Sequence, residues 1–244
     1  KKKVRKLSKH LKRLNLSKIT QLHRKEHKFS VKPRAGPHPN KESLTLALII
    51  RDYLGYSNTL WETKKILAQR KVKVNGKVVT DYKFPVGFMD VVSVIDLNKN
   101  FRVVYDTKGR LRLVEIPSED ALWKLSRVEN IRPIKGKKFQ YNLNDGRNFI
   151  LNEKIYNTGD SLKIDLSTGK VIDHIPLSEN SFAFITGGKN VGKIAKIESY
   201  KVVNAVTPNM VKFKDGFETE KNYVFPVGVI KPLVQLPEVN LNEQ

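Results

Sequence analysis

The stretch SLTLALIIRDYLGYSNTLWETKKILAQRKVKVNGKVVTD, residues 43–81, contains two helix signals followed by a hairpin signal. Ser43 is a suitable N-cap residue, the segment that follows is apolar over most of a helical surface, and Gly55 is a C-terminal stop. We therefore predict a first helix over Leu44 to Leu54.

A second helix and a hairpin follow directly. Thr59 and Glu62 have the spacing of a capping box, which predicts a helix from Thr59 to about Arg70. Alternating residues flank Asn75-Gly76, the strongest short signal for a β-hairpin. Cations on helix surfaces and at a hairpin tip can meet a nucleic-acid backbone without reading bases. The candidates are Arg51, Lys64, Lys65, Arg70, Lys71 and Lys77.

Downstream of this unit the apolar periodicity changes to that of strands. A hairpin is predicted around Asp106-Thr107-Lys108-Gly109, and one short helix over Ser118 to Leu125, capped by Ser118. Later turns separate short strands at the spacing of a compact barrel or sandwich. They lie at residues 144–146, 159–160 and 167–169, before a last β unit from Phe182 to about Ile230.

The segment upstream of this unit is strongly basic. Residues 1–38 contain fourteen Lys or Arg against one acid, Glu26, a formal charge of +13 out of +22 for the chain. Apolar residues are too sparse for a core and like charges repel, so we predict a mobile arm that a polyanion orders. Because basic extensions gain free energy by releasing counterions from phosphates, nucleic acid is the expected partner. The hinge Arg34-Ala35-Gly36-Pro37-His38-Pro39 follows, and we expect regular structure only beyond it.

The composition excludes several classes of protein. The chain has no cysteine, which removes disulfides, thiolate metal sites and cysteine nucleophiles and favours a reducing cytoplasm. Its longest apolar run, Leu46 to Ile50, is far shorter than the roughly 18 to 20 residues that span a bilayer. The place where a secretory signal is apolar is interrupted by His10, Lys12, Arg13 and Lys18, and a Lys-rich arm disfavours a mitochondrial presequence.

The segment Gly187-Gly188-Lys189-Asn190-Val191-Gly192-Lys193 has the glycine and lysine spacing of a phosphate-binding P-loop. However, Ile194 stands where Mg²⁺ requires Ser or Thr, and the residues from Lys193 to Val203 alternate like a strand, where a P-loop requires a helix. We predict a turn in a small barrel that touches RNA and binds no nucleotide, with contacts from Gly187, Lys189, Asn190, Gly192 and Lys193.

The pentapeptide His23-Arg24-Lys25-Glu26-His27 matches the H-x-x-E-H spacing of certain zinc peptidases. A zinc enzyme also needs a third ligand and a dry cavity, whereas this segment lies in a basic arm that repels Zn²⁺. We therefore predict no metal site, and we assign the arm's histidines to RNA contacts.

The unit of residues 43–81 resembles a small RNA-binding module shared by a bacterial ribosomal protein, tyrosyl-tRNA synthetases and pseudouridine synthases; a generic α/β unit is the alternative. An RNA-modifying enzyme, pseudouridine-synthase-like or accessory to one, is the competing function. In pseudouridine synthases with this module, Gly-Arg-Leu is followed by a catalytic Asp. Here Gly109-Arg110-Leu111 is followed by Arg112, which disfavours the enzyme.

Several segments together resemble one family, the e-type fourth protein of the small ribosomal subunit of archaea and eukaryotes. They are His10-Leu11-Lys12-Arg13, Gly36-Pro37-His38, Val74-Asn75-Gly76-Lys77, Pro85-Val86-Gly87-Phe88-Met89-Asp90-Val91, Phe101 to Arg110 and Thr186 to Ile194. The last resembles the KOW motif, which the family sets in an SH3-like barrel. The chain departs from the family pattern at Ser17 and Thr20, where a Pro and then an aromatic residue are usual.

This resemblance implies an α+β multidomain fold. The expected parts are a basic rRNA-binding arm (1–38), a helix-helix-hairpin RNA-binding module (39–94), a central β-rich domain (95–176), a KOW/SH3-like barrel (177–232) and a tail (233–244). It also implies a structural protein without catalytic residues or cofactor, in the cytoplasmic ribosome, beside neighbouring ribosomal proteins. From the arm, the expected contacts with small-subunit rRNA are Arg5, Lys9, His10, Lys12, Arg13, Arg24, Lys28, Arg34 and His38.

Overall fold

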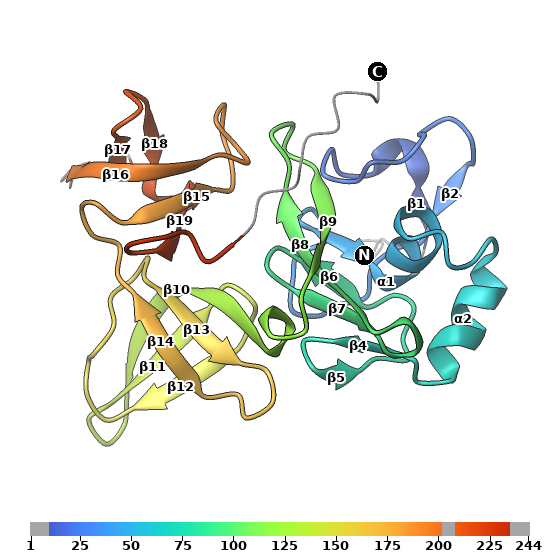
Figure 1. Cartoon of the computed structure of the whole chain (residues 1–244), viewed down its shortest axis with the longest axis horizontal. Coiled ribbons are helices and arrows are strands. Elements are labelled where there is room, and N and C mark those ends of the chain that lie inside the picture. Colours follow the sequence, from blue (N-terminus) through green and yellow to red (C-terminus); the bar gives the residue numbers. More distant parts are fainter. Residues whose placement is uncertain (1–9, 202–207, 235–244) are drawn as a thin grey trace, which may run out of the picture.

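The computed structural model describes residues 10–201 and 208–234. Within these residues the protein is mostly antiparallel β-sheet with few helices (Figure 1). Three five-stranded sheets carry most of the chain, and two short strand pairs accompany the first of them. None of the helices in the described part is long and apolar enough to cross a membrane.

The first sheet has the strand order β5-β4-β7-β8-β9 and holds the predicted hairpins. Its strands are β4 (Val72–Val74), β5 (Lys77–Val78), β7 (Val91–Val94), β8 (Lys99–Tyr105) and β9 (Leu111–Ile116). Asn75 and Gly76 have φ angles of +49° and +77°, which closes the β4–β5 turn as expected. A 3₁₀ turn at Ile95–Leu97 links β7 to β8, and the two pair directly, so this sheet continues across residue 94.

The first predicted helix was wrong over its first turn. Residues Ser43–Thr45 form strand β3, which pairs with β6 (Pro85–Gly87), and the Ser43 hydroxyl donates to the Pro39 carbonyl instead of capping a helix. Helix α1 (Leu46–Leu48) then continues as a π-helical segment, Ile49–Tyr53. This apolar run is buried throughout, so its composition carries no periodicity to separate strand from helix.

Helix α2 (Leu60–Ala68) begins as predicted, with the complete capping box of Thr59 and Glu62. The hydroxyl of Thr59 accepts from the Glu62 backbone N–H at 3.2 Å, and the Glu62 carboxylate accepts from the Thr59 and Asn58 backbone N–H groups. These backbone donors hold the pKa of Glu62 below its ordinary value. Leu67 is buried in the core beneath the helix.

The second sheet has the order β12-β11-β10-β13-β14. Its strands are β10 (Trp123–Ile134), β11 (Lys138–Leu143), β12 (Asn148–Leu151), β13 (Ser161–Asp165) and β14 (Val171–Ile175). The helix expected at Ser118 to Leu125 was wrong: a 3₁₀ turn at Asp120–Leu122 leads directly into β10. The Arg102 guanidinium donates to the carbonyls of Asp120 and Trp123 and so fixes this turn through a distant contact.

The third sheet has the order β18-β17-β16-β15-β19 and contains the predicted last β unit. Its strands are β15 (Phe182–Ile185), β16 (Ile194–Lys201), β17 (Met210–Phe213), β18 (Glu218–Glu220) and β19 (Val224–Gly228), with a 3₁₀ turn at Lys221–Tyr223. The strand expected from Lys193 to Val203 is confirmed up to Lys201, and the rest of it lies outside the described residues.

An aromatic cluster joins the first sheet to the third. The ring of Phe88 lies 5.1 Å from the rings of Tyr105, Phe184 and Phe225, measured between centroids. All four belong to one buried cluster that also takes in Trp123 and its neighbours from the second sheet. The three sheets therefore share a core, and surface loops from different sheets are held beside one another.

The described part of the arm is folded against the first sheet. Strand β1 (Leu11–Lys12) pairs with β2 (Phe29–Ser30), and a 3₁₀ turn occupies Arg13–Asn15. The Leu111 backbone N–H donates to the Ile19 carbonyl at 3.0 Å, which attaches the arm to β9. The expectation that regular structure begins only beyond Pro39 was therefore wrong. At the positions that depart from the family pattern, the Ser17 hydroxyl donates to the Lys41 carbonyl and Thr20 is buried.

Candidate nucleic-acid interface

The outer face of α2 presents cations beside an exposed Trp and a half-buried Tyr. Lys65 Nζ lies 5.4 Å from the Trp61 ring centroid, and Lys64 Nζ lies 4.6 Å from that of Tyr82. Trp61 is 70% exposed, which is unusual for the largest apolar side chain. An open indole next to ammonium groups can stack on a base while the ammonium groups meet phosphates. We call Trp61, Lys64 and Lys65 the α2 face.

The other four predicted cations of this unit differ in whether a protein carboxylate already pairs with them. The carboxylate of Asp52 accepts from Arg51, and Lys71 forms an ion pair with Asp96. Arg70 and Lys77 are exposed at the end of α2 and on β5. Arg51 and Lys71 thus each have a protein carboxylate that an RNA phosphate would have to replace or share.

In the arm, several predicted contacts lie on the surface. Lys12 is exposed on β1, and the ring of His10 lies 5.5 Å from Phe29, whose ring is also 5.6 Å from Lys28 Nζ. Arg34 is exposed and lies 3.5 Å from a carboxylate oxygen of Asp81. Two further predicted contacts, Arg5 and Lys9, lie outside the described residues.

Two predicted arm contacts are buried instead. The side chain of Arg13 is 4% exposed, and its Nη2 donates to Glu26 at 3.0 Å. His38 is buried against Gly87 and its Nε2 lies 2.9 Å from the Asp90 carboxylate. Neither side chain is therefore presented on an open arm as predicted, because Arg13 is buried and paired within the arm and His38 is buried against a residue 52 positions away.

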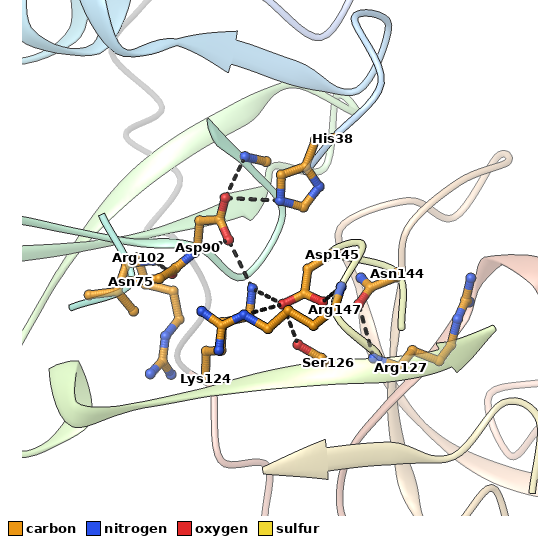
Figure 2. A network of polar contacts seen from close by, with 12 residues as sticks. His38, Asn75, Asp90, Arg102, Lys124, Ser126, Arg127, Asn144, Asp145 and Arg147 are labelled. Atoms are coloured by element: carbon orange, nitrogen blue, oxygen red, sulfur yellow. Dashed lines mark hydrogen bonds and ion pairs between the residues drawn. The ribbon is translucent and has the colours of Figure 1, made fainter. Parts of the chain in front are cut away.

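Asp90 is the centre of a buried polar cluster that links the arm, the first sheet and the second sheet (Figure 2). Its carboxylate accepts from His38, the Gly87 backbone N–H, the Asn75 amide and Lys124 Nζ, all at 2.8 to 3.0 Å. Burial alone would raise the pKa of Asp90. The charge of Lys124, with His38 and the Gly87 N–H, outweighs burial and holds that pKa far below its ordinary value.

Lys124 lies between two carboxylates, with its Nζ 3.0 Å from Asp90 and 2.7 Å from Asp145. It is 1% exposed, so its charge is balanced inside the protein and cannot reach a ligand. Asp145 is further held by Ser126 and Arg147, as Figure 2 shows. We call His38, Asp90, Lys124 and Asp145 the buried ion cluster. No local sequence pattern predicted it.

The loop at residues 187–193 joins β15 to β16 and rests on the β8–β9 turn. Gly192 has φ +81°, and a Cβ at this position would lie 2.5 Å from the carbonyl of Asp106. Lys189 and Lys193 are exposed, and Lys193 Nζ reaches the Asn190 amide oxygen at 3.4 Å. Gly187 packs on the ring of Tyr223. Because strand β16 follows the loop, there is no helix N-terminus here of the kind that a P-loop uses.

The histidine-containing pentapeptide shows no metal-site geometry. Glu26, the acid of this motif, accepts a hydrogen bond from Arg13, while Arg24 is half-buried and His23 and His27 are exposed. Across residues 10–201 and 208–234, no three His, Asp or Glu side chains come close enough to hold a metal ion.

The fold and the α2 face together define a class of protein. It is a β-rich protein whose surface presents lysines beside an exposed aromatic ring, as RNA-binding proteins do. Family models place the chain more narrowly. Residues 97–171 match the ribosomal family S4e, residues 53–92 match the S4 domain, and residues 6–41 match the RS4NT domain.

The sequences of relatives align with almost the whole chain. Small ribosomal subunit protein eS4 of Methanocaldococcus jannaschii is 44% identical over 239 residues, covering 93% of this chain and 97% of the relative. The eS4 protein of Desulfurococcus amylolyticus is 39% identical over 243 residues, covering 95% and 96%. The crystal structure of 30S ribosomal protein S4e from Thermoplasma acidophilum is similar with a TM-score of 0.69 and 37% identity, covering 78% of this chain and 96% of that one. The chain belongs to the S4e family of ribosomal proteins, which are structural proteins and not enzymes.

Proposed function

We propose that this protein is a structural constituent of the small ribosomal subunit in the cytoplasm, where it binds rRNA and adjoins other ribosomal proteins. Membership of the S4e family supports the assignment, since the relatives are named for that subunit. The observation that carries RNA binding is the α2 face, within the segment that matches the S4 domain. An exposed Trp contributes little to the core. Beside two lysines, its ring can stack on a base of RNA while the lysines contact phosphates.

Three surfaces contribute to RNA binding in this proposal: the exposed arm cations, the α2 face with Arg70 and Lys77, and the loop of residues 187–193. Each presents lysine or arginine side chains outward from a fixed backbone, which favours phosphate contacts that set position without reading sequence. The two lysines of the loop lie on either side of a turn whose glycines let the backbone approach a phosphate.

The finer division of the chain is also part of this proposal. We assign the third sheet to a KOW-type SH3-like barrel, because its five antiparallel strands carry the glycine loop between β15 and β16. We place the RNA-binding module around α2 and β4–β5. Because β7 pairs with β8, the module and the hairpin of β8 and β9 act as one body.

A binding titration tests the assignment. Affinity of the full chain for small-subunit rRNA is measured over a series of KCl concentrations, for wild type and for Lys64→Glu with Lys65→Glu. We expect weaker binding and a salt slope lowered by up to about 2, because two phosphate contacts are lost. The matched control is Lys135→Glu with Lys154→Glu, two exposed lysines in the loops between strands of the second sheet.

Equal affinities and slopes for the two double variants would place the binding face elsewhere. Wild-type protein that did not bind rRNA at low salt would contradict the proposed function itself. Co-sedimentation of the wild-type chain with small subunits through a high-salt gradient is the complementary measurement, because stable incorporation survives salt that removes nonspecific binding.

A further inference from the structure

A cavity of about 710 Å³ opens where the arm crosses the first sheet. The arm contributes Arg13, Lys18 and Arg24 to its wall, and the β8–β9 hairpin contributes Arg110 and Arg112. Tyr53, at the end of the π-helical segment, lines it from a third direction. Residues from three separate parts of the chain therefore line a single basic hollow that is partly open to solvent.

The wall of this cavity carries a surplus of positive charge. Five of its residues are Lys or Arg and two, Glu26 and Asp52, are acids. Both acids already have partners, since Glu26 accepts from Arg13 and Asp52 from Arg51. Across the described ranges, Lys18, Arg24 and Arg110 have no carboxylate within ion-pair distance. Unpaired charges gathered in one hollow attract an anion more strongly than the same charges spread over an open surface.

Two hydrogen-bond donors in the wall are also uncommitted. The Nε of Arg13 is buried and has no hydrogen-bond partner among the described residues. The hydroxyl oxygen of Tyr53 accepts from the Gln21 backbone N–H at 2.9 Å, which leaves its own hydrogen to donate. Burial raises the pKa of Tyr53 despite the nearby charges of Arg112 and Arg110, so this hydrogen is retained at neutral pH. A buried donor without an acceptor is destabilising, and a bound anion would remove that cost.

We propose that this cavity binds one backbone phosphate of RNA and thereby holds the arm against the first sheet. The proposal rests on the proposed function and assigns it a specific anchoring site. Planar guanidinium groups match the two free oxygens of a phosphodiester, and partial burial strengthens the charge-assisted hydrogen bonds. The phosphate would bridge Arg24 of the arm and Arg110 of the hairpin, two segments that the backbone hydrogen bond from Leu111 to Ile19 also joins.

Removing the two bridging charges tests the cavity. The full-length variant Arg24→Gln with Arg110→Gln is compared with Lys135→Gln with Lys154→Gln, which removes the same charge from the second sheet. Affinity for small-subunit rRNA is measured against KCl concentration. We expect the cavity variant to bind about tenfold more weakly, with a salt slope smaller by about 1, and the control to change by less than about threefold.

Cavity and control variants that bind alike, while the wild type binds tightly, would overturn this proposal and leave the proposed function standing. Wild-type protein that fails to bind rRNA would overturn both.

A second measurement needs no substitution. The side-chain Nε–Hε resonances of Arg13, Arg24 and Arg110 are followed by NMR in the wild-type chain during titration with a short single-stranded RNA, with inorganic phosphate and with KCl. Saturable shifts of these resonances with the RNA, and weaker ones with phosphate, support the proposal. Shifts with inorganic phosphate alone would make the cavity a free-anion site and overturn the RNA assignment, as would no response to either anion.

Discussion

The α2 face and the buried ion cluster use the same side chain in opposite ways. Lys64 and Lys65 lie on an open surface over aromatic rings, whereas Lys124 is enclosed between the carboxylates of Asp90 and Asp145. An exposed ammonium group keeps its hydration and can exchange it for a phosphate, but a buried one must have fixed counterions. In a strongly basic protein, position relative to the core therefore decides whether a cation serves the ligand or the fold.

The sharpest test of this comparison replaces a buried lysine and an exposed one by the same residue. Lys124→Met leaves Asp90 and Asp145 buried without their shared cation, so we expect a loss of about 3–5 kcal/mol in the free energy of unfolding. Lys64→Met, on the α2 face, should change it by less than about 0.5 kcal/mol. Urea denaturation followed by circular dichroism measures both. Similar losses for the two variants would mean that the buried cluster contributes no more than a surface charge.

Acid should weaken the buried ion cluster through Asp90. The pKa of Asp90 is held below its ordinary value of 3.8, so its ionised form stabilises the folded state above that pH. This contribution is lost as pH falls below that value and towards the pKa of the folded state. We expect the unfolding free energy of the wild type to fall more steeply than that of Asp90→Asn on acidification below about pH 4. Urea titrations over a pH series measure it, and parallel curves would contradict the prediction.

The loop of residues 187–193 combines features of the α2 face and of the buried ion cluster. Its lysines are exposed, whereas Gly192 is packed against the β8–β9 turn. Gly192 and Gly216 have nearly equal φ angles, +81° and +82°, but only Gly192 would place a Cβ against backbone, because nothing lies within 4 Å of a Cβ at Gly216. Gly216→Ala should cost about 1 kcal/mol from the backbone angle alone, and Gly192→Ala about 2–3 kcal/mol through the added clash. Equal losses in thermal or urea unfolding would show that the loop is not packed on the β8–β9 turn.

The smallest expected effect concerns the helix that carries the α2 face. Thr59→Ala removes the capping hydrogen bond to Glu62 and should destabilise the protein by about 1 kcal/mol. Thr59→Ser keeps the hydroxyl and should be close to wild type. Urea unfolding of the two variants measures the difference. If Thr59→Ala equalled Thr59→Ser, the capping box would contribute nothing to this helix.

Local features were predictable from the sequence because neighbouring residues produce them. The Asn75-Gly76 turn, the capping box of Thr59 and the strand after the glycine loop each follow from residues within a few positions of one another. The basic arm and the S4e family could be recognised in the same way, from composition and short motifs. The α2 face was half predicted: its lysines were identified, but the exposure of Trp61 depends on what the helix packs against.

The tertiary structure alone decided which charged side chains face inward. His38 meets Asp90 across 52 residues, and Lys124 meets it across 34. The cavity likewise combines Arg24 with Arg110, and the strand at Ser43–Thr45 exists because β6 pairs with it. A sequence specifies its own charge and local propensity. Whether a charge is buried depends on partners that distant segments bring to it, and no pattern of adjacent residues encodes that pairing.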